Sequence, residues 1–238
     1  MVMSTLLKFL YPPPPSLFIT TMSFISFASL ANAGFSEIKG KNMQYSKFFG
    51  TKKLKMMRRR STSQELRVKR GCFCCIALHF WLVIFVHKYS GSMDVEATIV
   101  ISSSYFLSTV TMIYCQLLTQ GLPEPSIDLK YGGFIIFLVG IIGNLYHHIL
   151  LSKLRTKGEN EYKIPQGGLF CFAICPHYLF EILIFIGFSC TSQTLYSISY
   201  TLGTTVYLIG RSIATRRWYK SKFDDFPKDI KALIPYIF

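Results

Sequence analysis

The feature that most limits the fold of this chain is a series of apolar runs. A helix of about 20 apolar residues crosses the roughly 30 Å hydrocarbon core of a membrane. Such runs occupy 16–35, 71–87, 95–118, 131–151, 168–190 and 195–210, and 71–87 is only marginally long enough. Half of all residues are apolar, 16% are charged, and the mean hydropathy is +0.35. The sequence predicts an all-α protein, a polytopic transmembrane helical bundle of about six spans.

The first apolar run has two interpretations. Residues 16–35 follow Lys8 and four prolines and contain Ala31-Asn32-Ala33, a combination that resembles a cleavable signal peptide. Alternatively, the run is a first membrane span that stays attached. Positive charge follows the run rather than preceding it, and this order favours the retained span.

Positive charge is concentrated between the apolar runs. The formal net charge is +14, and residues 51–70 alone hold nine Lys or Arg against one Glu. Basic loops beside membrane spans mark the cytoplasmic side. The loop 152–166 and the tail from Arg211 are also basic, so we expect a cytoplasmic C-terminus. No aromatic residues are interleaved in the basic block, and a membrane-side loop is therefore favoured over nucleic-acid binding.

The seven cysteines indicate neither a disulfide framework nor a zinc site. Four lie in or next to apolar runs, where a thiol behaves as a small hydrophobe: Cys115, Cys171, Cys175 and Cys190. Three follow the basic block at the edge of an apolar run, a placement that permits S-palmitoylation: Cys72, Cys74 and Cys75.

Polar side chains gather where the run 131–151 ends. Asn144 and His148 are four residues apart and share a helix face, next to His147. Arg155 follows about two turns later and is suited to a bidentate phosphate contact. Polar groups in a membrane helix usually face a partner or a cavity. For this cluster alone, snorkelling and helix capping at the membrane interface remain the simpler explanation.

A second polar group lies in the run 168–190. Pro176 removes a helix hydrogen bond, so we expect a kinked span there. His177 and Glu181 are again four residues apart, and we expect them to form a site at membrane depth. Gly167-Gly168 leaves backbone N–H groups at a helix start open to an anion, although a plain turn explains two glycines as well. No metal site is predicted, because no matching set of carboxylates accompanies the histidines.

Three ordered motifs carry a family resemblance: IPQGGLF at 164–170, CPHYLFEI at 175–182 and RRWYKSKFDDFPKDIKALIPYIF at 216–238. They resemble the C-terminal domain of the steroid 5α-reductase family over about residues 87–238. The resemblance implies a seven-helix endoplasmic-reticulum enzyme that uses NADPH to reduce a carbon–carbon double bond conjugated to a carbonyl. The implied partners are a lipid-like substrate and membrane lipids, with no nucleic acid and no obligate protein partner. We expect an N-terminal span and basic loop at 1–70 and the reductase-like domain at 71–238.

The resemblance also implies the site residues. The implied cofactor-binding residues are Asn144, His148, Arg155, Tyr162, His177, Arg211 and Tyr219, and Glu181 matches a buried pocket glutamate. Three positions depart from the steroid reductases. His148 stands in place of an aspartate, His177 in place of an asparagine, and Thr215 in place of a histidine.

Residues 50–86 depart most from the family. Two apolar runs lie between the loop 152–166 and the tail, so both can be on the cytoplasmic side. Two more runs lie between 87–94 and the loop 152–166, which puts 87–94 on the cytoplasmic side as well. Only one apolar run then separates 87–94 from the basic block, so either 71–86 does not cross the membrane or one span is missing between 50 and 71. Our hypothesis is an altered exon or reading frame that removed a span and the carbonyl-polarising group, which leaves the catalytic acid unassigned. The alternatives are a very-long-chain enoyl-CoA or polyprenol reductase, a non-catalytic relative, and a transporter or scaffold without nucleotide binding.

Overall fold

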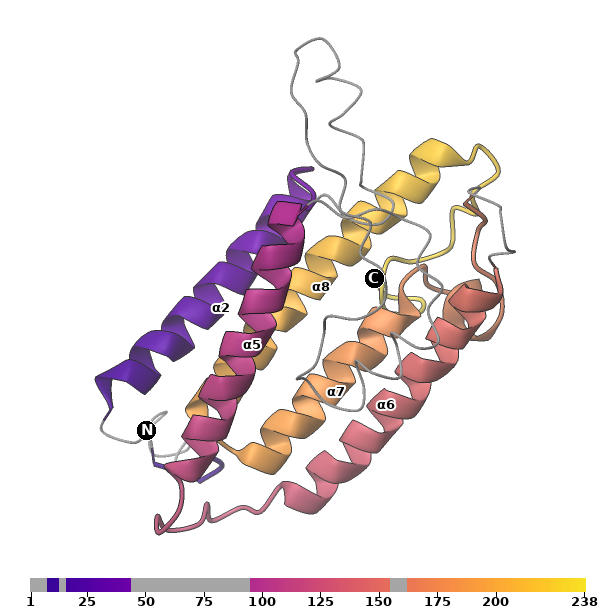
Figure 1. The fold of residues 1–238 in the computed structure, drawn as a ribbon. Coiled ribbons are helices and arrows are strands. Elements are labelled where there is room, and N and C mark those ends of the chain that lie inside the picture. The colour runs from indigo at the N-terminus through magenta and orange to yellow at the C-terminus, as the bar shows by residue number, and fades with distance from the viewer. Residues whose placement is uncertain (1–7, 13–15, 44–94, 155–161) are drawn as a thin grey trace, which may run out of the picture.

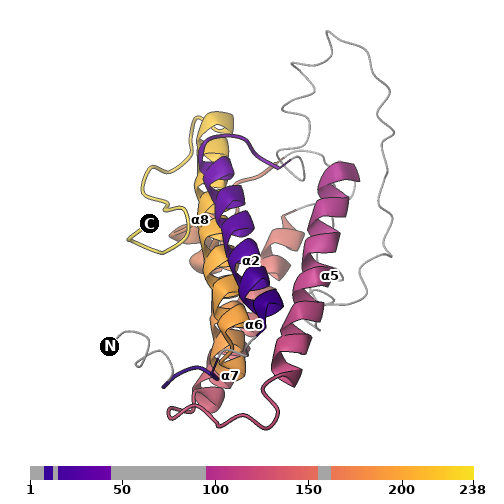
Figure 2. The ribbon, with the colours of Figure 1, turned by 90° about the vertical axis from the view of Figure 1, so that its left-hand side faces the viewer.

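The computed structural model describes residues 8–12, 16–43, 95–154 and 162–238. They form five long helices that run side by side as a bundle (Figure 1): α2 Leu17–Ile38, α5 Val95–Leu117, α6 Lys130–Lys153, α7 Pro176–Ser192 and α8 Leu195–Lys222. A 3-10 turn, η2 Gly168–Cys171, precedes α7. Figure 2 shows α2 and α8 as a close pair with α5 set apart from them.

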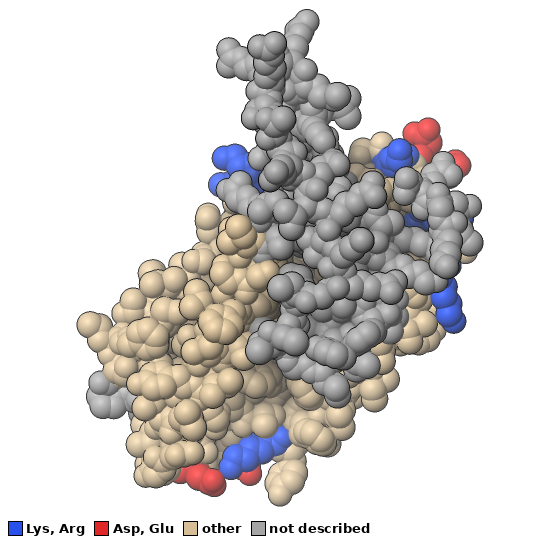
Figure 3. Space-filling model, in the orientation of Figure 1, with Lys and Arg blue, Asp and Glu red and all other residues tan. Residues whose placement is uncertain are grey.

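The bundle has the surface of a membrane protein. Three helices, α2, α5 from Ile99 and α6, are long and apolar enough to cross a membrane. Large apolar side chains such as Leu17 and Ile142 point outward from them. On the face in Figure 3, the coloured Lys, Arg, Asp and Glu side chains gather toward the two ends, and the tan surface visible between them is uncharged. The predicted all-α membrane bundle is confirmed.

Glycines let α6 and α7 pack closely in antiparallel directions. A Cβ on Gly133 would lie 2.8 Å from the carbonyl oxygen of Gly187, and one on Gly140 would lie 2.7 Å from the α7 backbone. Gly143 lies against an aromatic ring of α7. Gly132, on the same helix, takes no part in this contact. A Cβ there would meet no atom within 4 Å, because Gly132 faces away from α7.

The helices α2 and α8 run in the same direction and also pack through glycines. A Cβ on Gly34 would lie 2.5 Å from the carbonyl oxygen of Val206, and Gly210 packs against the backbone of Gly34. Toward the helix starts, the hydroxyls of Ser26 and Tyr196 lie 3.1 Å apart. The first apolar run therefore forms a helix that packs within the bundle, and its retention in the mature protein stays a prediction.

Two predicted spans have different bounds in the structure. Pro176 occupies the first turn of α7 rather than a kink inside a helix over 168–190, because proline lacks the N–H that a first turn leaves unused. Gly167 and Gly168 precede it with φ of 87° and 54°, which other residues adopt at a cost. The last helix was expected to end at 210, yet α8 continues for three more turns to Lys222.

One side chain fastens the end of the bundle where α7 turns into α8. Gln193 has φ of 48°, and its amide donates to the carbonyls of Phe9 at 2.6 Å and Ile127 at 2.9 Å. Its side-chain oxygen accepts from the N–H of Leu129 at 3.2 Å, and its backbone carbonyl accepts from Tyr11 at 2.9 Å. Three separate segments of chain are thereby joined at one buried residue.

Candidate functional site

The polar residues predicted from the sequence gather at the other end of the bundle, which we call the loop end. It comprises the C-terminal turns of α2, α6 and α8, the first turn of α7, and the segments 162–175 and 223–238. In Figure 1 it is the upper end, where the yellow C-terminal segment meets the tops of α6 and α7. Arg155, at 155–161, lies outside the described residues, as do the basic block, the domain boundary at residue 70, Cys72, Cys74, Cys75 and the altered segment.

Asn144 joins α6 to the start of α7. Its side chain is completely buried, and its amide nitrogen donates to the carbonyl oxygen of His177 at 2.8 Å. Its amide oxygen is also buried and has no hydrogen-bond partner among the residues that the structure describes. Such an unpaired buried acceptor costs roughly 1–3 kcal/mol. The oxygen is therefore suited to accept a hydrogen bond from a bound ligand.

Both ring nitrogens of the nearby His147 make hydrogen bonds within the protein. Its Nδ1 lies 2.7 Å from the carbonyl oxygen of Gly143, and its Nε2 accepts the N–H of Leu169 at 3.2 Å. Because the carbonyl can only accept, Nδ1 must carry the proton in this arrangement. The ring also stacks on Phe180 with centroids 5.1 Å apart. His147 therefore holds the IPQGGLF segment against α6 and α7.

The structure brings together the two histidines that depart from the steroid-reductase pattern. The rings of His148 on α6 and His177 on α7 meet edge to face, with centroids 5.2 Å apart. His177 is 9% exposed and also lies beside Tyr178, with centroids 4.2 Å apart. Both predicted site histidines thus lie next to Asn144, on the helix pair that the glycines bring together.

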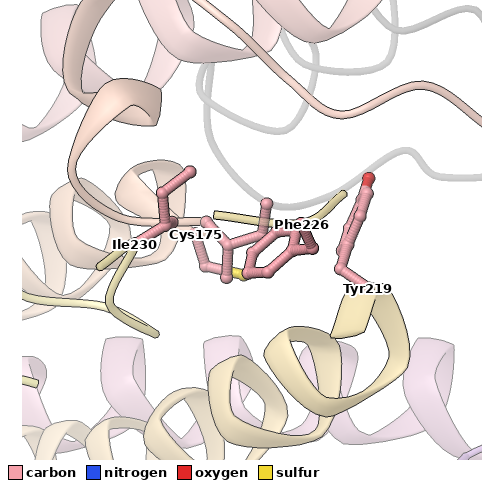
Figure 4. Close-up of a cluster of buried hydrophobic side chains, with 5 residues drawn as sticks. Cys175, Tyr219, Phe226 and Ile230 are labelled. Atoms are coloured by element: carbon pink, nitrogen blue, oxygen red, sulfur yellow. The ribbon is translucent and has the colours of Figure 1, made fainter. Parts of the chain in front are cut away.

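Aromatic residues connect two further predicted positions. The rings of Tyr162 and Trp218 lie 4.9 Å apart, and Trp218 contacts Tyr219 at 5.0 Å. Tyr219 is buried in a cluster with Ile174, Cys175, Phe226 and Ile230. Figure 4 shows Tyr219 standing up from α8 beside Phe226, with its hydroxyl turned away from the other labelled side chains.

Backbone hydrogen bonds join the C-terminal segment to the residues just before α7. The N–H of Ile174 donates to the carbonyl of Lys231 at 2.9 Å, within a parallel bridge. From α8, Arg216 donates to the carbonyls of Ile230 at 2.6 Å and Lys228 at 3.0 Å. Arg216 therefore holds the segment 223–238 against α8.

Arg211 is buried rather than presented at the surface. Its Nη1 lies 2.8 Å from Oε1 of Glu37 at the end of α2, and both side chains are 1% exposed. Glu37 was not predicted from the sequence as a site residue. A signal was present, because an acidic residue at the end of an apolar run requires a partner. The partner is 174 positions away in the chain, so the sequence alone did not identify it.

Thr215 follows Arg211 by one turn on the same face of α8. Its side chain is 1% exposed, and its hydroxyl has no hydrogen-bond partner among the described residues. Like Asn144, it therefore offers a buried polar atom to a ligand at the loop end.

Glu181 lies one turn into α7 and is half-buried, without a hydrogen bond or ion pair to any described residue.

Comparisons with known proteins agree with the motifs. Residues 95–238 match the family model described as 3-oxo-5-alpha-steroid 4-dehydrogenase. The chain is 34% identical over 169 residues to a very-long-chain enoyl-CoA reductase of Dictyostelium discoideum, covering 68% of this chain and 56% of that one. It is 30% identical over 176 residues to human 3-oxo-5-alpha-steroid 4-dehydrogenase 2, covering 71% and 67%.

A plant protein is also similar. The chain is 41% identical over 107 residues to the steroid 5-alpha-reductase DET2 of Gossypium hirsutum, covering 44% of this chain and 42% of that one. The matched regions thus span between 42% and 67% of the length of these three curated relatives.

Proposed function

The chain belongs to the 3-oxo-5-alpha-steroid 4-dehydrogenase family, and on this basis we propose that it is an NADPH-dependent reductase acting on a lipid-like substrate. The bond reduced is a carbon–carbon double bond conjugated to a carbonyl. The names of the relatives support this reaction class, since a 3-oxo-4-ene steroid and an enoyl-CoA both contain that group. The substrate of this chain is a 3-oxo-4-ene steroid or a compound of similar reactivity.

The observation that carries the proposal is the pair of buried polar atoms at the loop end. The amide oxygen of Asn144 and the hydroxyl of Thr215 are buried without partners among the described residues. Buried polar atoms in a native structure are normally hydrogen-bonded. The ribose hydroxyls and carboxamide of a nicotinamide dinucleotide supply donors for both. The residues present therefore fit the cofactor that the family implies.

Each element of the loop end has a role in holding the cofactor. Arg211 supplies positive charge for its phosphates, with the bidentate geometry that a guanidinium offers. Arg155, which lies outside the described residues, is proposed from the family resemblance to add a second such charge. Asn144, His148 and His177 present polar groups from α6 and α7. Tyr162 and Tyr219 flank Trp218 and provide aromatic surface, and the segment 223–238 excludes water. When bound, NADPH supplies a hydride to the β-carbon of the substrate.

Glu181 is half-buried one turn into α7, and the family resemblance assigns it to the substrate side of the pocket. The acid that polarises the substrate carbonyl is not assigned to a described residue. The lipid-facing band of the bundle gives an apolar substrate access from the membrane.

Charge supports an orientation in the membrane. The loop end carries a cluster of basic side chains: Lys153, Lys163, Arg217, Lys220 and Lys222. The opposite end carries Glu124, which pairs with Lys130 at 3.1 Å, and Asp128. Basic residues favour the cytoplasmic side. We therefore propose that the loop end and the C-terminus lie in the cytoplasm, and the family resemblance supports the endoplasmic-reticulum membrane as the location.

A second substrate class is a very-long-chain enoyl-CoA. The enoyl-CoA reductase of Dictyostelium shares 34% identity with this chain, against 30% for the human steroid enzyme over a similar length. Both substrates accept a hydride at a β-carbon, so the nucleotide site is the same for either. Their difference lies in the group attached to the carbonyl.

The test is NADPH oxidation by microsomes or purified protein given a steroid enone, a trans-2-enoyl-CoA or a polyprenol. We expect turnover of the steroid or the enoyl-CoA. Thermal protection by NADPH is measured in parallel, with Arg155→Ala expected to abolish it and Lys153→Ala, an exposed basic neighbour, to retain it. NADPH protection without turnover of any substrate would indicate a non-catalytic relative. Absence of both would refute nucleotide binding and the proposed function with it.

A further inference from the structure

The ion pair between Arg211 and Glu37 is the most buried charged contact that the described residues make. The two atoms lie 2.8 Å apart, and Oε1 of Glu37 also accepts the N–H of Met43 at 2.9 Å. With its amide oriented as the neighbouring groups require, Asn42 donates to Oε2 at 2.8 Å. The carboxylate of Glu37 is therefore held from both oxygens, and it in turn holds one edge of the Arg211 guanidinium.

Helix attachment alone does not account for this pair. Burying two charges costs as much as or more than their attraction returns, and apolar residues of similar volume often replace such pairs without loss. A carboxylate at the C-terminal end of a helix is also unfavourable for the helix dipole. Moreover, α2 is already joined to α8 through Gly34 and Gly210 and through Arg217, which donates to the carbonyl of Ile38.

What the pair does fix is the position of one cation. A guanidinium is a rigid plane with five N–H donors, so a bond at Nη1 restricts its orientation. Arg211 shares a face of α8 with Thr215, whose buried hydroxyl has no partner among the described residues. One face of α8 thus carries an oriented cation and an available hydroxyl one turn apart.

We propose that Glu37 is a positioning residue for the dinucleotide: it orients the Arg211 guanidinium toward a cofactor phosphate and so makes α2 part of the nucleotide site. This inference rests on the proposed function. It makes a prediction opposite in sign to simple electrostatics. A carboxylate near a phosphate site should weaken binding through repulsion, so its removal should tighten binding. If Glu37 acts by orienting Arg211, its removal weakens binding.

The test measures the Kd of NADPH for the full chain in detergent, by nucleotide fluorescence, together with the thermal midpoint. We expect Glu37→Gln to raise the Kd about tenfold, a loss of about 1.4 kcal/mol. Glu37→Asp, which keeps the charge on a shorter arm, should recover part of the affinity. The matched control is Arg217→Gln, which loosens the same end of α2 and should lower the midpoint without changing the Kd.

Two further variants separate positioning from attachment. Exchanging the charges, with Glu37→Arg and Arg211→Glu together, should restore the thermal midpoint but leave NADPH binding weak. Arg211→Lys keeps the charge and loses the planar fork, so it should also weaken NADPH binding about tenfold, and it tests the inference if Glu37→Gln does not fold.

An unchanged or lower Kd in Glu37→Gln, or in Arg211→Lys where Glu37→Gln does not fold, would overturn the inference and leave the proposed function standing. Full recovery of the Kd in the charge exchange would do the same. A wild-type chain that binds no NADPH would overturn both.

Discussion

Asn144 and His147, two polar residues near the end of α6, differ in their hydrogen bonds and therefore in their expected roles. His147 uses both ring nitrogens within the protein, at Gly143 and Leu169. Asn144 uses its nitrogen at His177 and leaves its oxygen buried without a described partner. The sequence placed both near the end of a span. It could not tell them apart, because their partners lie on η2 and α7 and depend on how closely those elements approach α6.

Asn144→Leu tests the role of the buried amide oxygen. The change removes one hydrogen bond worth about 1 kcal/mol and also removes an unpaired buried acceptor of comparable cost. The free energy of unfolding of the nucleotide-free protein should therefore change by no more than about 1 kcal/mol. The rise in thermal midpoint on adding NADPH, which reports binding to the folded state, should largely disappear. A normal NADPH-induced rise in this variant would show that the oxygen does not meet the cofactor.

At the scale of elements, the lengths of the apolar runs predicted the bounds of some helices, whereas tertiary packing determined the bounds of the others. The runs at 16–35, 95–118 and 131–151 correspond to α2, α5 and α6 within a few residues. The start of α7 was misplaced because proline suits both a kink and a first turn. The second half of α8 is polar, and it remains helical because it packs against the segment 223–238 and against α2. The pairing of α2 with α8 is a contact between distant segments that local pattern does not encode.

Gly140→Ala tests the close contact between α6 and α7. A Cβ at this position would lie 2.7 Å from the backbone nitrogen of Ile184, so the helices must separate. Overpacking of this kind typically costs about 1–3 kcal/mol, and we expect a lower thermal midpoint in detergent. The matched control is Gly132→Ala on the same helix, where a Cβ meets nothing within 4 Å. Equal effects of the two substitutions would contradict the glycine contact.

The junction at Gln193 is a second element-scale test. Gln193→Ala loses three side-chain hydrogen bonds, worth about 1 kcal/mol each, and keeps an unfavourable left-handed backbone. Gln193→Gly loses the same bonds but relieves the backbone, so it should be the less destabilised of the two by about 1 kcal/mol. Thermal unfolding of both variants measures the difference. A glycine variant as stable as the wild type would show that the bonds to Phe9, Ile127 and Leu129 contribute nothing.

At the scale of the whole molecule, the predicted class of protein is confirmed, and the structure brings most of the candidate site residues to one end of the bundle, where their role stays a prediction. Six of the eight predicted site residues lie at the loop end, Glu181 follows one turn into α7, and Arg155 lies outside the described residues. What sequence reasoning missed was the ion partner of Arg211. Glu37 lies just after the first apolar run, whereas the motifs that carry the resemblance begin at 164, so no local pattern connected the two.

The orientation of the bundle is open to a direct test with its own cysteines. Cys171 is exposed at the loop end, while Glu124 is exposed at the opposite end. One variant keeps Cys171 and replaces the other six cysteines, and a second lacks all seven and carries Glu124→Cys. In sealed microsomes a membrane-impermeant maleimide should label Cys171 directly, because we propose that the basic loop end faces the cytoplasm. The substituted position 124 should be labelled only after the membrane is permeabilised, and the reverse pattern would place the candidate site in the lumen.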